Sequence, residues 1–281
     1  MRAGSATRIW QLLECALGHS ADGDYPAAES CLRKALSLPA PPDCHLGITR
    51  PALWNELGIV RKYRGKLDSA ERYYRLALRH ARRFTNTPGR EFFLANLYHN
   101  LGGVEHARGR FWRAAAHARK GLRLRLQCVR SGSLAAASDM AALAAILDGL
   151  EAYKESEKLH RYALKIYQRE YGSSHPEIAI VLNNLGALYQ ATKRPKRAEF
   201  FYRAALKMKR HVLPARHPDI AITMSNLAMF YSVHARHSLA RLWSKRALQL
   251  LEGSLGHSHR TTRAVRKNHQ RIARAKEIGW Q

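Results

Sequence analysis

Small residues return along this chain at a nearly constant interval, and this repetition limits the possible folds more than any other feature of the sequence. We call the first set of these residues the reference positions. They are Ala16, Gly58, Gly102, Ala144, Gly186 and Ala228, and they are 42 residues apart except for one step of 44. A period in this range is typical of repeat proteins, in which each unit packs only on its neighbours.

Two more small residues follow each reference position, after 12 and after 19 residues. The second set is Ala28, Ala70, Ala114, Ser156, Ala198 and Ala240, and the third set is Ala35, Ala77, Gly121, Ala163, Ala205 and Ala247. Small side chains at matched positions let two antiparallel helices approach closely. The sequence therefore predicts an all-α fold, in which each unit is a pair of helices.

A large apolar residue precedes most reference positions, and we expect it to fill the groove between the paired helices. The residues in this place are Leu57, Leu101, Leu143, Leu185 and Leu227. In the first unit the place is taken by Cys15, which we expect to act as a small hydrophobe in the core. Cys128 is likewise interpreted as a buried thiol.

The second unit resembles the tetratricopeptide repeat (TPR), whose pattern is W-x2-L-G-x2-Y followed by A-x3-F. It has Trp54, Leu57, Gly58, Ala70 and Tyr74 at the matching places. The fifth unit matches at Leu185, Gly186, Tyr189, Ala198 and Tyr202, and the sixth at Leu227, Ala228, Tyr231 and Ala240.

Several units depart from the pattern at the last aromatic residue of the first helix. Arg61, Glu105 and Leu147 stand there in the second, third and fourth units. The period also exceeds the usual 34 residues of the family. The longer period and the pairs His175-Pro176 and His217-Pro218 resemble the kinesin-light-chain variety of the repeat. We interpret both pairs as helix entries, because proline suits the first helical turn.

This resemblance implies a right-handed superhelical α-solenoid in one domain, residues 5–279. We expect helical units at 8–40, 50–84, 92–131, 135–172, 176–214 and 218–256, with a basic capping helix at 259–278. In the capping helix the reference position is Gln270, a polar residue on which no further unit is expected to stack.

The chain is strongly basic, with 48 Lys and Arg against 21 Asp and Glu and a net charge of +27. Such a field attracts acidic proteins, nucleic acid or anionic lipid, although a compositional bias of the source genome would also produce it. The four cysteines Cys15, Cys31, Cys44 and Cys128 form no Cys-x-x-Cys pair or zinc-like spacing. We therefore expect reduced thiols, no metal or other cofactor, and a cytoplasmic protein. The sequence leaves the oligomeric state open.

The resemblance implies that the first helices of all units line a concave face that binds a peptide. On this face we predict a groove formed by Asn55, Lys62, His99, Asn183, Gln190 and Ser225. The asparagine amides both donate and accept hydrogen bonds, so they suit a peptide backbone. In the alternative interpretation, Asn55 and Asn183 bond neighbouring helices. Lys62 and His99 favour acidic groups on the partner.

A second group of candidate residues is basic and lies on the second helices, the turns and the capping helix. It consists of Arg82, Arg83, Lys193, Arg194, Arg266 and Lys267. These side chains either form a solvated face or contact phosphates. Since the sequence contains no catalytic motif, the first hypothesis is a non-enzymatic scaffold for an acidic partner peptide. A nucleic-acid-binding repeat protein is the alternative, and a helper subunit or sensor separated from an effector is the third.

Overall fold

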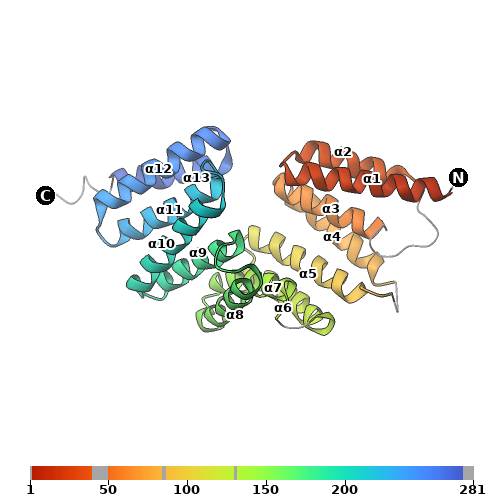
Figure 1. Cartoon of the computed structure of the whole chain (residues 1–281), viewed down its shortest axis with the longest axis horizontal. Helices are drawn as coiled ribbons and strands as arrows, with labels where there is room; N and C mark the ends of the chain where they lie inside the picture. Colours follow the sequence, from red (N-terminus) through yellow and green to blue (C-terminus); the bar gives the residue numbers. More distant parts are fainter. Residues whose placement is uncertain (1, 40–49, 84–86, 130–131, 275–281) are drawn as a thin grey trace. The chain divides into compact units, whose positions relative to one another are not determined.

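The computed structural model describes residues 2–39, 50–83, 87–129 and 132–274 (Figure 1). Within these ranges the chain is helical and contains no strand, which confirms the all-α prediction. The expected ends of the first three units at residues 40, 84 and 131, Cys44, and the end of the capping helix at 275–278 lie outside the described residues. The single solenoid over residues 5–279 stays a prediction.

The helices divide into two compact units, residues 1–150 and 151–281. The first unit contains α1 Arg2–Ala21, α2 Tyr25–Ser37, α3 Arg50–Tyr63, α4 Leu67–Ala81, α5 Arg90–Ala107, α6 Phe111–Cys128 and α7 Leu134–Asp148. The second contains α8 Tyr153–Tyr171, α9 Pro176–Ala191, α10 Pro195–Val212, α11 Pro218–Val233, α12 His237–Leu255 and α13 Arg260–Arg274. In each unit, helices that follow one another along the chain pack together.

All three sets of small residues are buried, as the repeat pattern predicts. The reason is visible at two reference glycines, where an aromatic ring of the second helix occupies the space of a side chain. A β-carbon on Gly186 would lie 2.6 Å from the Tyr202 ring, and one on Gly58 would lie 2.4 Å from the Tyr74 ring. The aromatic residue of the repeat therefore requires the glycine opposite it.

Two predictions about cysteines were wrong. The leucines that precede the reference positions are buried, but Cys15 is exposed on α1, with its sulfur beside Cys31 of α2. Ile9, Leu13 and Ala16 supply the buried face of this helix instead. Cys128 is also exposed and not a buried thiol, and its Sγ donates to the carbonyl of Leu124. Both residues lie outside the buried stripe of their helix, which a match to the repeat pattern does not reveal.

The turn inside each repeat has the same backbone conformation, seven residues after the reference position. The residues there are Gly23, Gly65, Gly109, Glu151, Lys193 and Ala235, and all have φ between 54° and 80°. In most turns the next backbone N–H bonds the carbonyl five residues earlier, as from Arg194 to Tyr189 at 2.8 Å. This is a Schellman-type helix end, in which glycine is favoured but other residues occur.

The histidine–proline pairs begin helices, as expected. His175 and His217 precede α9 and α11, and the Nδ1 atom of each accepts the backbone N–H two residues later at 3.2 Å. His259 does the same for α13 without a following proline. These histidines satisfy helix N-termini and therefore have a structural role.

A glutamate of one second helix joins the end of the next first helix. In residues 151–281, Glu157 of α8 accepts from the Tyr189 hydroxyl at 2.8 Å and from Arg194 at 3.0 Å. One period later, Glu199 accepts from Tyr231 at 2.9 Å and from Arg236 at 2.8 Å. The hydroxyl of the repeat tyrosine is thus used between repeats.

Residues 1–150 keep this junction at repeats in which the tyrosine is replaced. Arg61 has the tyrosine's place and binds Glu29 directly, as does Arg64. In the next repeat Arg108 binds Glu71, and it also bonds Glu105, the residue that replaces the tyrosine there. The departures from the family pattern therefore change the chemistry of the junction and preserve its position.

Replacing Gly186 by alanine tests the close packing of the paired helices. We expect Gly186→Ala to lower the free energy of unfolding by about 1–3 kcal/mol, because the new methyl group overlaps the buried Tyr202 ring. The control is Gly253→Ala, in the exposed part of α12 with nothing within 4 Å. This variant should be about 0.5–1 kcal/mol more stable, since alanine favours the helix. Urea unfolding followed by circular dichroism measures both, and equal effects of the two variants would contradict the packing argument.

The junction glutamates predict acid sensitivity. Burial would raise the pKa of Glu157, but the Tyr189 hydrogen bond and the charge of Arg194 lower it below its ordinary value of 4.5. The pKa values of Glu29 and Glu71 are lowered in the same way by their arginine partners. The unfolded chain then binds more protons than the folded one at these carboxylates. Their contribution to stability is therefore fully present above pH 4.5 and is lost as the pH falls through the lowered pKa values.

We expect Glu157→Gln to cost about 1 kcal/mol at pH 7 and to reduce the loss of stability below pH 4.5. Glu14→Gln, at an exposed carboxylate of α1, should change stability at pH 7 by less than about 0.5 kcal/mol. Urea titrations at several pH values measure both. An unchanged acid profile in Glu157→Gln would show that this junction does not contribute.

Candidate functional site

The predicted groove asparagines bond from one first helix to the next. The Oδ1 of Asn55 on α3 accepts from Asn100 on α5 at 2.9 Å, and that of Asn183 on α9 accepts from Asn226 on α11 at 3.1 Å. Asn55 is buried and also donates to Glu56 at 3.0 Å, so both polar atoms of its amide are engaged. Asn183 is half-buried, and among the described residues its Nδ2 has no hydrogen-bond partner. The amide of Asn183 is therefore the less occupied of the two.

His99 belongs to a buried polar network that the sequence did not suggest. Its Nδ1 lies 2.7 Å from Asp139 of α7, and the other oxygen of Asp139 accepts from Arg125 of α6 at 2.8 Å. Arg125 also donates to Asn96 at 2.6 Å and covers the Phe92 ring, 4.1 Å from its centroid. Since the side chains of Arg125 and Asp139 are each only 4% exposed, this pair holds α6 against α7.

Lys62 is a half-buried cation near the end of α3. Desolvation lowers its pKa, and its ammonium group lies 5.2 Å from the centroid of the Tyr63 ring. Within the described part of the chain, no carboxylate forms an ion pair with it. The remaining two groove candidates are internal, since Gln190 accepts from Tyr202 at 3.1 Å and Ser225 is buried.

A groove lies between the second helices α10 and α12, with its floor on α11. Its volume is about 1070 Å³. The floor and walls are apolar and include Phe200, Leu227, Leu239 and Trp243. Phe200 is 65% exposed, an unusual degree for a phenylalanine on a helix whose other face is packed.

Basic side chains surround this groove, which we call the α10–α12 groove. They are Lys196, Arg203, Lys207, Arg210 and Arg236. The only carboxylate in its lining is Glu199, which already binds Arg236 and lies 3.7 Å from Arg203. Arg210 and Arg246 both lie against the Trp243 ring, at 5.4 and 5.5 Å. The α10–α12 groove is therefore apolar inside and positive at its rim.

The family model of the tetratricopeptide repeat matches residues 49–127 and 134–211, together more than half of the chain. This chain belongs to the tetratricopeptide repeat family. TPR proteins are helical-repeat scaffolds for protein interactions and are generally not catalytic, so binding is the kind of activity to expect. Among curated proteins, no sequence matches this chain.

Solved structures show the same fold. BtubC (BKLC) of P. vanneervenii is 23% identical, with a TM-score of 0.62 over 88% of this chain and 93% of that one. The TPR-like repeats of a kinesin-light-chain-like protein from Podosopora anserina are 16% identical, with a TM-score of 0.57 over 74% of this chain and 98% of that one. RapI in its apo form is 12% identical, with a TM-score of 0.64 over 96% of this chain and 99% of that one. These likenesses show that the chain has the fold of other TPR proteins, two of which have kinesin-light-chain-like names.

Half of the predicted basic residues of this TPR protein bond within their own unit. Arg82 donates to the Tyr98 hydroxyl, Arg194 to Glu157, and Arg266 to Glu252 at 2.7 Å. Arg83, Lys193 and Lys267 are exposed. The six predicted basic residues include none of the cations that surround the α10–α12 groove. A spacing of three and four residues along 196–210 would have shown that these cations share one face of a helix.

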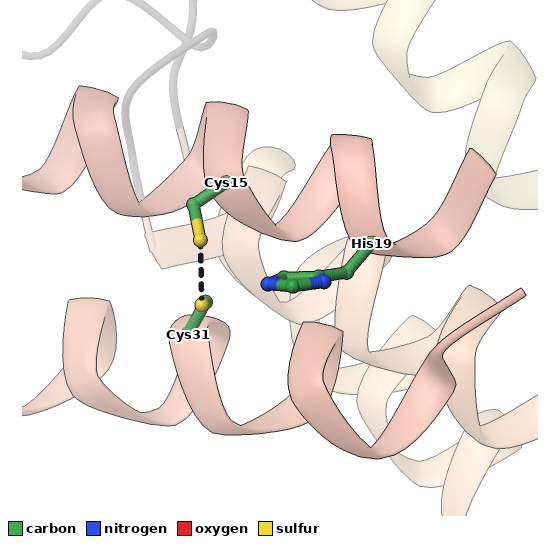
Figure 2. Close-up of side chains that lie close together, drawn as sticks. All are labelled: Cys15, His19 and Cys31. Atoms are coloured by element: carbon green, nitrogen blue, oxygen red, sulfur yellow. Dashed lines mark hydrogen bonds between the residues drawn. The ribbon is translucent and has the colours of Figure 1, made fainter. Parts of the chain in front are cut away.

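The structure also brings together three residues of metal-binding types in the first helical pair. Cys15, His19 and Cys31 lie close to one another on α1 and α2 (Figure 2). The search for Cys-x-x-Cys pairs missed this group. The separation of Cys15 and His19 by one helical turn was visible in the sequence, but the approach of Cys31 depends on how the two helices pair.

Among the helices of the described residues, none combines the length and the apolar character that a bilayer crossing requires.

The buried pair of Arg125 and Asp139 gives a prediction for stability. Asp139→Ala should cost about 3–5 kcal/mol, because it leaves the Arg125 guanidinium buried without its carboxylate. Asp68→Asn is the control, since the Asp68 side chain is fully exposed although it also bonds an arginine. It should cost less than about 1 kcal/mol.

The double variant Arg125→Met with Asp139→Leu separates a missing charge partner from a general packing defect. It should recover most of the stability that Asp139→Ala loses. Urea unfolding measures all three variants. A double variant as unstable as Asp139→Ala would contradict the charge argument.

Proposed function

We propose that this TPR protein is a non-enzymatic scaffold that binds an acidic, amphipathic segment of a partner protein. The α10–α12 groove carries this proposal, because its apolar interior and positive rim complement such a segment. Apolar side chains of the segment would contact Phe200, Leu239 and Trp243. Its carboxylates would pair with the cations at the rim, as in other helix-in-groove complexes.

The charge balance of the groove supports an anionic partner. Five cations and one carboxylate line it, and that carboxylate is already engaged by arginine. Like charges held close together on one surface repel each other, and an acidic partner relieves this repulsion. The net charge of +27 adds a long-range attraction that speeds the encounter and weakens with salt.

The first-helix residues remain a second candidate surface for the same partner chemistry. Lys62 supports it, since a desolvated lysine without a carboxylate partner among the described residues gains from a bound anion. Asn183 adds a free amide donor. Asn55 supports the alternative interpretation, because its amide is consumed by contacts to Asn100 and Glu56.

The alternative of nucleic-acid binding rests on the same α10–α12 groove. Trp243 and Phe200 offer rings on which bases stack, and the rim offers phosphate contacts. We favour a protein partner because apolar side chains of three helices line the groove and because the family binds proteins. The two ligands are separated by experiment.

The test is a fluorescence-anisotropy titration of the full chain with two labelled probes. One is a helical peptide with glutamates on one face and leucines on the other, and the second is single-stranded oligothymidylate. The groove variant is Lys207→Glu with Arg210→Glu, at two exposed cations of the rim. The matched control is Lys158→Glu with Lys165→Glu, two exposed lysines of α8 that give the same change in net charge.

We expect the groove variant to bind the peptide at least about tenfold more weakly than the control variant. Equal weakening by both variants would mean that the overall field attracts the peptide, and would contradict the groove. Tighter, groove-dependent binding of oligothymidylate would support the nucleic-acid alternative. If Lys62→Ala weakens peptide binding and the groove variant does not, the peptide binds on the first-helix face.

A further inference from the structure

Three side chains with ligand atoms for a soft metal ion meet at the first helical pair. Cys15 and His19 are one turn apart on α1 and therefore lie on the same face, and Cys31 faces them from α2 (Figure 2). The two sulfurs are 3.0 Å apart, and all three ligand atoms lie within 4.8 Å of one another. Figure 2 shows the His19 ring with one nitrogen on the side nearest the sulfurs.

Asp24 stands behind the histidine and is itself held in place. Its Oδ2 lies 3.9 Å from Nδ1 of His19, while its Oδ1 accepts the backbone N–H of Ala27 at 3.1 Å and so caps the start of α2. This separation is longer than a hydrogen bond, and a small rotation of the two side chains would let Asp24 accept from Nδ1 and leave Nε2 for a ligand. This arrangement of carboxylate, histidine and metal is common in protein metal sites.

The spacing suits a zinc ion. Tetrahedral zinc with two sulfurs and one nitrogen holds these atoms about 3.5–3.8 Å apart. The sulfurs are closer than this, at 3.0 Å, and all three ligand atoms lie within 4.8 Å of one another, so small side-chain rotations are enough to reach it. Two thiolates balance the charge of a divalent zinc ion, and thiolate with imidazole is the ligand set that zinc prefers.

We propose that Cys15, His19 and Cys31 bind a zinc ion that links α1 to α2, with a fourth position open to solvent. Cys15 is exposed and the other two residues are half-buried, so an ion reaches the site without unfolding the pair. The fourth position is open because three ligand residues meet at this place in the described part of the chain. The link stabilises the first helical pair, because metal bound to the folded state alone adds to its stability.

The nearness of the two sulfurs also permits a disulfide, which is the competing interpretation. A disulfide needs neither an imidazole beside the sulfurs nor a carboxylate behind that imidazole, whereas a zinc site uses both. The positions of His19 and Asp24 therefore favour the metal. Binding would release the thiol protons, so it is measured in buffered solution at constant pH.

The experiment titrates the reduced, metal-free full chain with Zn²⁺ in competition with a chromogenic chelator. We expect one zinc ion per chain, and an affinity more than about 100-fold weaker in Cys31→Ser and in Cys15→Ser. Asp24→Asn should bind about tenfold more weakly while still capping α2, because asparagine caps helices as well as aspartate does. Cys128→Ser, at the exposed thiol of α6, is the control and should bind like the parent chain.

Cobalt gives a second readout. Co²⁺ bound by two thiolates has intense sulfur-to-metal absorption in the near ultraviolet, and this band should disappear in the Cys15→Ser, Cys31→Ser double variant. Circular dichroism confirms that each variant is folded. Zinc affinity unchanged in the double variant, or no zinc uptake by the reduced chain, would overturn the proposal, and so would a Cys15–Cys31 disulfide in protein that takes up no zinc after reduction.

Discussion

Close approach of paired helices is the constraint on which the rest of this structure depends. It requires small residues at three places in every repeat, and all of these residues are buried. At Gly186 and Gly58 the space is taken by a tyrosine ring of the second helix, so glycine and tyrosine act as one packing unit. Where Ala118 stands in place of the tyrosine, Gly102 instead lies against the backbone of α6. The pairing is therefore maintained by two different contacts.

Polar contacts then connect one repeat to the next. A glutamate of one second helix bonds the end of the following first helix at several junctions. It accepts from tyrosine and arginine in residues 151–281 and from arginine in residues 1–150. The asparagine pairs make a parallel connection between first helices. These contacts explain how repeats that depart from the family pattern still stack, because a changed residue finds the same partner.

These structural contacts also decide which polar side chains remain available for binding. Asn55, His99 and Gln190 are occupied by structural hydrogen bonds, whereas Lys62 and the cations around the α10–α12 groove keep capacity for an anion. Desolvation makes the unpaired charge of the half-buried Lys62 costly, whereas the groove cations are exposed and act through their number and closeness. The zinc site proposed at Cys15, His19 and Cys31 is separate from both surfaces, and it concerns the stability of the first helical pair.

The amino-acid sequence by itself determined the helical pairs, their period, the buried small residues and the helix starts at His175 and His217. These features depend on local periodicity and on size at fixed spacing, which a single sequence records. It could not show that Cys15 is exposed beside α2, since the repeat pattern aligns positions without stating which side of α1 is buried.

Only the tertiary structure decided which side chains distant in sequence meet. It joined His99 to Asp139 across 40 residues, set Cys31 beside Cys15 and His19, and formed a groove from three helices. The physical reason is that such contacts depend on the rotation of each helix about its own axis. Packing of the whole helix surface sets that rotation, and no single motif encodes it.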